Sequence, residues 1–231
     1  MTVSRIMLLH SPLVGPSAWA ACGAALAARG RAAEVVALPP VASLAAPFYP
    51  AMAAVVGQAL AGGAPATLVV HSGAGALVPA IAAAAPGAVR SVLYVDAILP
   101  HPGRNWFATA GSDLGQALRA ASQDGAVPAW DQWFPPGALG GLLADEAQRA
   151  AFLAELAPTP LAYLEEAAPE VDLPADMPWG YLRLSKAYET EAAEARRVGA
   201  PALRADLHHL AMMSDPEAVT TSMLQLIRML G

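Results

Sequence analysis

The most informative feature of the sequence is a serine that stands between an apolar run and a stretch of small residues. Residues 68–77 read Leu-Val-Val-His-Ser-Gly-Ala-Gly-Ala-Leu, which predicts a buried strand that turns sharply at Ser72 into a helix. Such a turn lifts the serine hydroxyl above the sheet, where the N–H of Gly73 and the helix N-terminus face any oxyanion. The alternative is an ordinary strand-to-helix turn in which the serine caps the helix.

The elements that would position Ser72 alternate between strands and helices. Short apolar runs predict strands at residues 5–10, 33–38, 66–70, 89–96, 181–184 and 201–206. Alanine-rich or amphipathic stretches predict helices at residues 17–29, 49–60, 74–85, 189–198 and 216–230. This alternation predicts an α/β fold with a mostly parallel sheet and helices on both faces.

Residues 101–177 interrupt the alternation with repeated prolines and short helical patterns. We expect this segment to form a helical cap inserted into a core made of residues 1–100 and 178–231. Its aromatic residues would either line an apolar pocket or form the core of the cap itself. The pocket candidates among them are Trp106, Trp130 and Trp133.

Four stretches of the sequence resemble the α/β-hydrolase superfamily, in particular its small lipase and esterase members and its hydroxynitrile-lyase-like members. In chain order they are Leu8-Leu9-His10 with Trp19, His71-Ser72-Gly73, Tyr94 to Pro100, and His208-His209-Leu210 ahead of Asp215-Pro216-Glu217. The resemblance covers nearly the whole chain. It implies an α/β-hydrolase fold, with Ser72 as the nucleophile and His209 as the base.

The sequence offers more than one candidate for the base and for the acid of the implied triad. His209 is preferred over His208 because it has the spacing that the resemblance implies and follows the last predicted strand. The superfamily mostly has an aspartate after the penultimate strand, but residues 185–189 contain none. The resemblance also allows an acid at the end of the strand after the nucleophile helix, where Asp96 stands. Asp96 is therefore expected to orient His209, with Glu189 as the alternative and a purely loop-fixing role for Asp96 left open.

The implied oxyanion hole also departs from the family. The resemblance places its second donor two residues after His10, and this residue is Pro12, which has no N–H. Loss of one such donor slows a hydrolase about 10²- to 10³-fold. Either the N–H of Leu13 or the hydroxyl of Ser11 replaces it, or the reaction forms no oxyanion. His10 and His71 are interpreted as structural histidines that bond backbone groups.

Composition excludes several classes of partner. The chain has 231 residues, with 13 Lys+Arg against 19 Asp+Glu and no basic patch, so nucleic acid is not an expected partner. The apolar residues 65–86 are interrupted by polar residues, Gly and Pro, and residues 1–14 lack a signal-peptide pattern, so no membrane association is predicted. A single cysteine and no metal-type spacing predict a cytoplasmic protein without disulfide, metal or cofactor. The sequence is also compatible with a homodimer.

These residues are compatible with three functions. The first is a serine hydrolase that acts on a hydrophobic small-molecule ester, thioester or acyl substrate. The second is a lyase or cyclase of the same fold in natural-product biosynthesis, which Pro12 and the only lysine, Lys186, favour. Lys186 would hold a substrate carboxylate in the pocket, or it would simply be solvated. The third is a binding protein that uses the pocket as a receptor.

Overall fold

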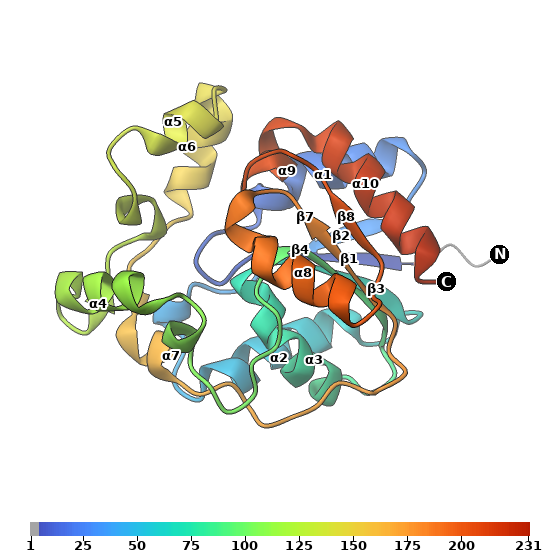
Figure 1. The fold of residues 1–231 in the computed structure, drawn as a ribbon, viewed down its shortest axis with the longest axis horizontal. Helices are drawn as coiled ribbons and strands as arrows, with labels where there is room; N and C mark the ends of the chain where they lie inside the picture. Colours follow the sequence, from blue (N-terminus) through green and yellow to red (C-terminus); the bar gives the residue numbers. More distant parts are fainter. Residues whose placement is uncertain (1–4) are drawn as a thin grey trace.

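A six-stranded parallel sheet forms the centre of the computed structural model, which describes residues 5–231 (Figure 1). Its strands are β1 (Arg5–Leu9), β2 (Ala33–Val36), β3 (Ala66–Ser72), β4 (Val89–Ala97), β7 (Trp179–Arg183) and β8 (Ala202–Arg204). Their order is β2-β1-β3-β4-β7-β8, and each neighbouring pair is parallel. The predicted α/β class with a parallel sheet is confirmed. Residues 1–4, the start of the segment in which no signal peptide is predicted, lie outside the described residues.

Helices cover both faces of this sheet. On one face α1 (Ser17–Ala28), α9 (Ala211–Ser214) and α10 (Pro216–Met229) pack together, and on the other α2 (Phe48–Leu60) packs against α3 (Val78–Ala84) (Figure 1). A further helix, α8 (Glu189–Arg197), packs against β7. Because both faces are covered, strands such as β3 are buried at every residue, which explains why they read as continuous apolar runs.

The segment after Ser72 differs from the prediction. The strand continues through His71 and Ser72, and the predicted helix 74–85 begins as a 3-10 turn, η2 (Gly73–Leu77), before α3. Gly75 explains the tight packing here, because a Cβ at this position would overlap the carbonyl oxygen of Ile98 after β4. The small residues therefore let the turn lie directly against the end of the neighbouring strand.

The insertion between β4 and β7 contains short helices and a small two-stranded antiparallel sheet that was not predicted. The helices are α4 (Ser112–Ala121), α5 (Ala138–Leu142), α6 (Glu146–Ala154) and α7 (Leu161–Glu165), with 3-10 turns η3 (Trp106–Ala108) and η4 (Trp130–Trp133). This small sheet pairs β5 (Ala126–Val127) with β6 (Thr159–Pro160). In Figure 1 these elements lie beside the sheet rather than on either of its faces.

Two carboxylates of the insertion hold it to the core. Glu155 accepts hydrogen bonds from the backbone N–H and the hydroxyl of Ser17, at 3.1 and 2.6 Å. Glu166 accepts from the N–H groups of Phe48 and Tyr49, at 2.8 and 3.0 Å. Each carboxylate thus satisfies donors in the first turn of a core helix, where the helix dipole favours negative charge. Within residues 5–231, no helix has the length and apolar character needed to cross a membrane.

Candidate active site

Ser72 lies at a strained turn between β3 and η2. Its backbone has φ 55° and ψ −127°, a conformation that non-glycine residues rarely adopt. Ser72 lines a cavity of about 380 Å³ together with Gly73 and Leu13. The loop after β1 passes close to the residue that follows the serine. A Cβ on Gly73 would lie 3.1 Å from Ser11 Oγ, closer than ordinary van der Waals contact, so a small residue fits best here.

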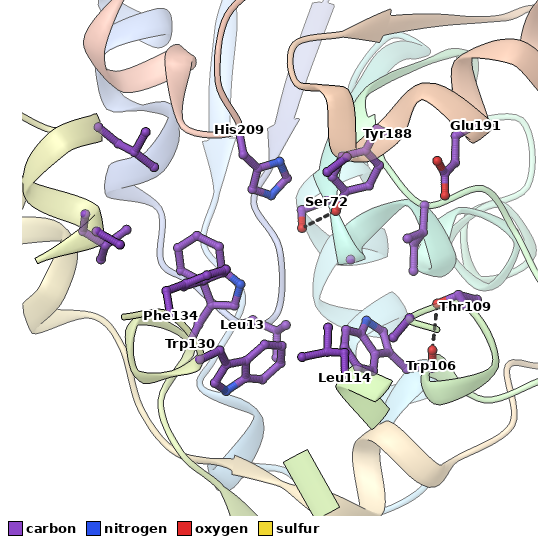
Figure 2. Close-up of a pocket in the computed structure, with 18 residues that line it drawn as sticks. Leu13, Ser72, Trp106, Thr109, Leu114, Trp130, Phe134, Tyr188, Glu191 and His209 are labelled. Carbon is purple, nitrogen blue, oxygen red and sulfur yellow. Dashed lines mark hydrogen bonds between the residues drawn. The ribbon is translucent and has the colours of Figure 1, made fainter. Parts of the chain in front are cut away.

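His209 reaches the same cavity from the loop after β8 (Figure 2). Its Nδ1 lies 3.0 Å from Asp96 Oδ2. The neighbouring His208 is used differently, since its Nε2 lies 2.8 Å from Ser214 Oγ and its Nδ1 accepts from Leu210 N. Of the two candidate histidines, His209 is therefore the one in contact with the acid and the cavity.

His71 contacts His209 through both its ring nitrogen and its ring face. Its Nε2–H donates to the carbonyl oxygen of His209 at 3.0 Å, and the two rings pack with centroids 4.4 Å apart. Burial, with a further contribution from the nearby His209, lowers the pKa of His71 well below its ordinary value, so the ring is neutral. A neutral ring at this place can stack on His209 without charge repulsion.

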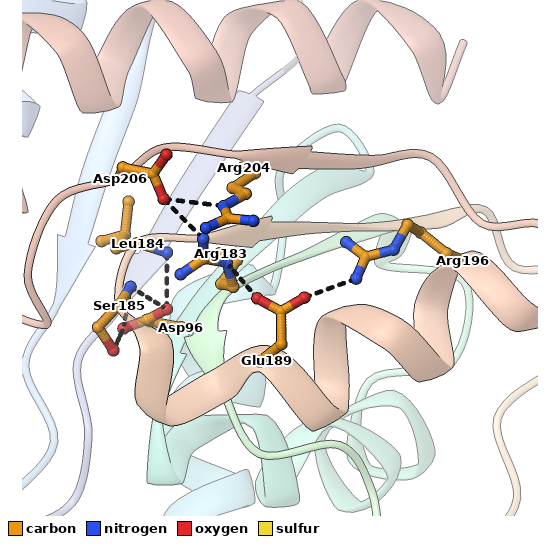
Figure 3. A network of polar contacts seen from close by, with 8 residues as sticks. All are labelled: Asp96, Arg183, Leu184, Ser185, Glu189, Arg196, Arg204 and Asp206. Atoms are coloured by element: carbon orange, nitrogen blue, oxygen red, sulfur yellow. Dashed lines mark hydrogen bonds and ion pairs between the residues drawn. The ribbon is translucent and has the colours of Figure 1, made fainter.

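Asp96 is fully buried at the end of β4 and is held by several donors (Figure 3). It accepts from the backbone N–H of Leu184 at 2.7 Å, from the N–H of Ser185 at 3.0 Å, and from the Ser185 hydroxyl at 2.6 Å. Ser185 follows β7, the place where the sequence lacks an aspartate. The hydroxyl at that place thus fixes a carboxylate that comes from the neighbouring strand.

The two other charged candidates lie elsewhere. Glu189 forms ion pairs with the buried Arg183 at 3.0 Å and with Arg196 at 2.8 Å, so arginines engage both of its carboxylate oxygens (Figure 3). The interpretation of Lys186 as a pocket residue is not supported, because Lys186 is exposed and is not among the residues that line the cavity.

The loop after β1 forms a tight turn around Pro12. The N–H of Val14 donates to the carbonyl oxygen of Ser11 at 3.1 Å, which puts Pro12 at the second position of a β-turn, where proline is favoured. The N–H of Leu13 donates to Ser11 Oγ at 3.3 Å. His10 anchors the loop, since its ring nitrogens lie 2.8 Å from Ser11 O and 3.0 Å from the N–H of residue 38.

The cavity beside Ser72 and His209 is walled mainly by apolar side chains of the insertion. They are Trp106, Ala110, Leu114, Trp130, Trp133, Phe134, Ala138, Leu139 and Leu142. Trp130 also approaches His209, with ring centroids 6.1 Å apart. Glu191 is the lining carboxylate; burial raises its pKa, and the charge of Asp96 raises it further. The three tryptophans singled out in the sequence therefore all border the cavity.

Tyr188 is a site residue that sequence reasoning missed. Its ring stacks on His209 with centroids 5.1 Å apart and an angle of 8°, and its hydroxyl lies 3.3 Å from Ser72 Oγ (Figure 2). It belongs to the turn η5 (Lys186–Tyr188) directly after β7. The available signal was its place at the carboxyl end of a parallel strand, in a stretch where only the lysine and the acid were considered.

Among residues 5–231, no three histidine, cysteine, aspartate or glutamate side chains gather in a way that could hold a metal ion. Cys22, the single cysteine, is buried on α1, where its thiol faces the carbonyl oxygens of Met212 and Pro216.

Comparison with known proteins identifies the fold. No protein-family model and no curated protein sequence matches the chain. An extracellular α/β-hydrolase from a Paenibacillus species, described as sharing structural and functional homology with tobacco salicylic acid binding protein 2, superposes with a TM-score of 0.77 and 16% identity, covering 96% of this chain and 98% of its own.

Two further solved structures have the same architecture. A pyrethroid hydrolase from Sphingobium faniae has a TM-score of 0.73 and 17% identity, with 97% of each chain covered. Tomato methylketone synthase I in complex with 2-tridecanone has a TM-score of 0.73 and 15% identity, with 100% of each chain covered. At these identities the likeness concerns the fold, which agrees with the parallel sheet, the serine turn and the insertion after β4. The chain has the α/β-hydrolase fold.

Proposed function

We propose that this protein is a serine hydrolase of hydrophobic small-molecule esters, with Ser72, His209 and Asp96 as its catalytic triad. The observation that carries the proposal is the 3.0 Å contact between His209 Nδ1 and Asp96 Oδ2 beside a serine in a strained turn. An acid on Nδ1 leaves Nε2 unprotonated and able to accept the serine proton. The alternative of a serine that merely caps a helix has no support, since no side-chain cap is formed by Ser72.

The reaction would follow the ordinary course of acyl transfer. Ser72 Oγ attacks the ester carbonyl carbon while its proton passes to His209 Nε2, and the carbonyl π electrons move onto oxygen. The C–O bond to the leaving group then breaks, and the leaving alkoxide takes the proton from His209. Water then gives a proton to His209 Nε2 and attacks the acyl carbon. The C–Oγ bond breaks, Ser72 Oγ takes the proton back from His209, and the carboxylic acid leaves. No cofactor takes part in these steps.

The cavity supports an apolar substrate. Its tryptophan, phenylalanine and leucine walls would bury a hydrocarbon or aromatic group, and its size of about 380 Å³ lies at the lower end of ordinary ligand sites. The structurally similar pyrethroid hydrolase and polyneuridine aldehyde esterase are named for hydrolytic activities. The proposal includes a cytoplasmic location, which agrees with a sequence whose single cysteine leaves no pair for a disulfide.

A lyase or cyclase of the same fold is the second candidate, and one observation favours it. The hydroxyl of Ser72 bonds to Tyr188 at 3.3 Å, and Pro12 supplies no oxyanion donor, so the site is less complete than that of a typical esterase. In such an enzyme His209 would move a substrate proton without a covalent bond to Ser72. Reaction with a fluorophosphonate probe separates the two, because only an activated serine is labelled.

The test uses the full chain, a fluorophosphonate probe and p-nitrophenyl esters of increasing acyl length. We expect labelling and hydrolysis in the wild type and the loss of both in Ser72→Ala. Ser43→Ala is the matched control, because Ser43 is exposed and bonds only a backbone carbonyl of its own turn. Continued ester turnover in folded Ser72→Ala, or a wild type that is neither labelled nor active on esters, would contradict the proposal.

A further inference from the structure

Tyr188 is fixed beside the nucleophile by two independent contacts. The ring stacks almost parallel on His209, 5.1 Å between centroids, and the hydroxyl lies 3.3 Å from Ser72 Oγ. The side chain also lines the cavity that would hold the substrate. Figure 2 shows the hydroxyl directed at Ser72 rather than into the surrounding protein. The stacked ring therefore holds one O–H group at a set place next to the reacting atom.

In the loop after β1, neither Pro12 nor Leu13 has a backbone N–H free to bind an oxyanion. Pro12 has no N–H, and the N–H of Leu13 already donates to Ser11 Oγ at 3.3 Å. Gly73, directly after the nucleophile, remains as the backbone donor that lines the cavity. Hydrolases usually place at least two donors on the oxyanion, and each contributes about 10²- to 10³-fold to the rate.

The Tyr188 hydroxyl is chemically suited to make up this deficit. Burial raises the pKa of Tyr188 above its ordinary value; the Ser72 bond opposes the shift, and the negative charges of Asp96 and Glu191 add to it. The hydroxyl therefore keeps its proton at neutral pH, so it can donate a hydrogen bond but cannot act as a base. The oxyanion would be two bonds away from Ser72 Oγ. A small movement of the Tyr188 side chain would therefore bring its hydroxyl from Ser72 Oγ to the oxyanion.

We propose that the Tyr188 hydroxyl donates a hydrogen bond to the oxyanion formed when Ser72 attacks, in place of the N–H that Pro12 lacks. The inference rests on the proposed hydrolase function. The phenol proton stays on Tyr188 throughout, so no bond to this residue forms or breaks. When the oxyanion forms, the hydroxyl exchanges its contact with Ser72 Oγ for a shorter, charge-assisted one.

The first test compares Tyr188→Phe with the wild type, because phenylalanine keeps the ring stacked on His209 and removes only the hydroxyl. We expect kcat to fall about 100-fold, with KM changed less than about threefold. Tyr94→Phe is the matched control: the Tyr94 hydroxyl is buried and has no hydrogen-bond partner among residues 5–231, so its removal should leave kcat unchanged.

Two further measurements separate a donor to the oxyanion from a merely structural residue. A trifluoromethyl ketone forms a tetrahedral adduct with the serine, and its affinity should fall in Tyr188→Phe by the same factor as kcat, whereas the unreactive methyl ketone of equal length should bind as before. Pro12→Ala restores a backbone donor to the oxyanion site. It should raise kcat by a larger factor in the Tyr188→Phe background than in the wild type.

Each outcome decides between the two proposals. If Tyr188→Phe hydrolyses esters like the wild type, or weakens both ketones equally, or is not rescued by Pro12→Ala, the Tyr188 inference is wrong and the hydrolase proposal is unaffected. If the wild type shows neither labelling nor ester hydrolysis, the hydrolase proposal fails and the inference fails with it.

Discussion

Replacing Asp96 by asparagine tests the acid of the triad most directly. The amide oxygen can still accept from the N–H groups of Leu184 and Ser185, which lie 2.7 and 3.0 Å from Oδ1. The amide nitrogen then takes the place of Oδ2, which faces His209 Nδ1 at 3.0 Å. Because an amide nitrogen donates, it forces Nδ1 to accept and puts the ring proton on Nε2. In this tautomer His209 cannot take the proton of Ser72.

The expected loss in kcat is about 10⁴-fold, the size that the same change causes in a serine protease, which corresponds to about 5.4 kcal/mol of activation free energy. The fold should survive, because the Ser185 hydroxyl, 2.6 Å from Oδ2, can rotate to accept from the new amide. Exchanging charge-assisted for neutral hydrogen bonds should cost about 2 kcal/mol and lower Tm by about 4–8 °C.

The assay measures kcat on a p-nitrophenyl ester well below the Tm of the variant, with Tm recorded by calorimetry. Glu189→Gln is the matched control, since it makes the same acid-to-amide change in a residue that pairs with Arg183 and Arg196. We expect its kcat to stay within about threefold of the wild type. The reasoning is refuted if Asp96→Asn keeps kcat within about tenfold of the wild type, or if Glu189→Gln is the slower variant.

Three stability measurements test other parts of the site. Ser72→Gly should be inactive yet have a Tm about 2–4 °C above that of Ser72→Ala, because glycine adopts φ 55° without the strain of about 1 kcal/mol; equal Tm values would contradict this. Gly75→Ala should lose about 3 kcal/mol of unfolding free energy in urea, since its Cβ overlaps a backbone carbonyl. Gly57→Ala, whose Cβ would make ordinary contacts in α2, should not be destabilised. If both variants lost similar amounts of unfolding free energy, the overlap at Gly75 would not be the cause. Burial lowers the pKa of His71 well below 6.5 in the folded protein. As the pH falls below 6.5, the unfolded chain binds a proton at His71 before the folded protein does, so stability is lost. Unfolding free energies from urea titrations between about pH 8 and pH 5 should depend less steeply on pH in His71→Asn than in the wild type, by up to about 1.4 kcal/mol per pH unit. An unchanged pH dependence would exclude His71 as its origin.

The sequence by itself determined the core of the fold and the sharp turn at Ser72. Strands buried on both faces must be apolar throughout, and the links between them must turn, so local pattern was sufficient to locate the strands and helices of the sheet to within a few residues. The turn at Ser72 was predictable for the same reason, because the residues that permit it, Gly73 and Gly75, are its neighbours in sequence. The insertion was less predictable, since β5 and β6 pair across an intervening stretch that itself contains α5 and α6.

Only the tertiary structure decided which side chains surround the serine. Asp96 and His209 are 113 residues apart, and Tyr188 is 116 residues from Ser72. Parallel strands bring their carboxyl ends to one edge of the sheet, so the sequence could say that the loops after β4, β7 and β8 meet there. It could not say that Tyr188 turns inward while Lys186 turns to solvent, two residues earlier in the same turn. The direction of a loop side chain is set by the neighbours that it packs against, here the ring of His209, and those neighbours come from distant parts of the chain.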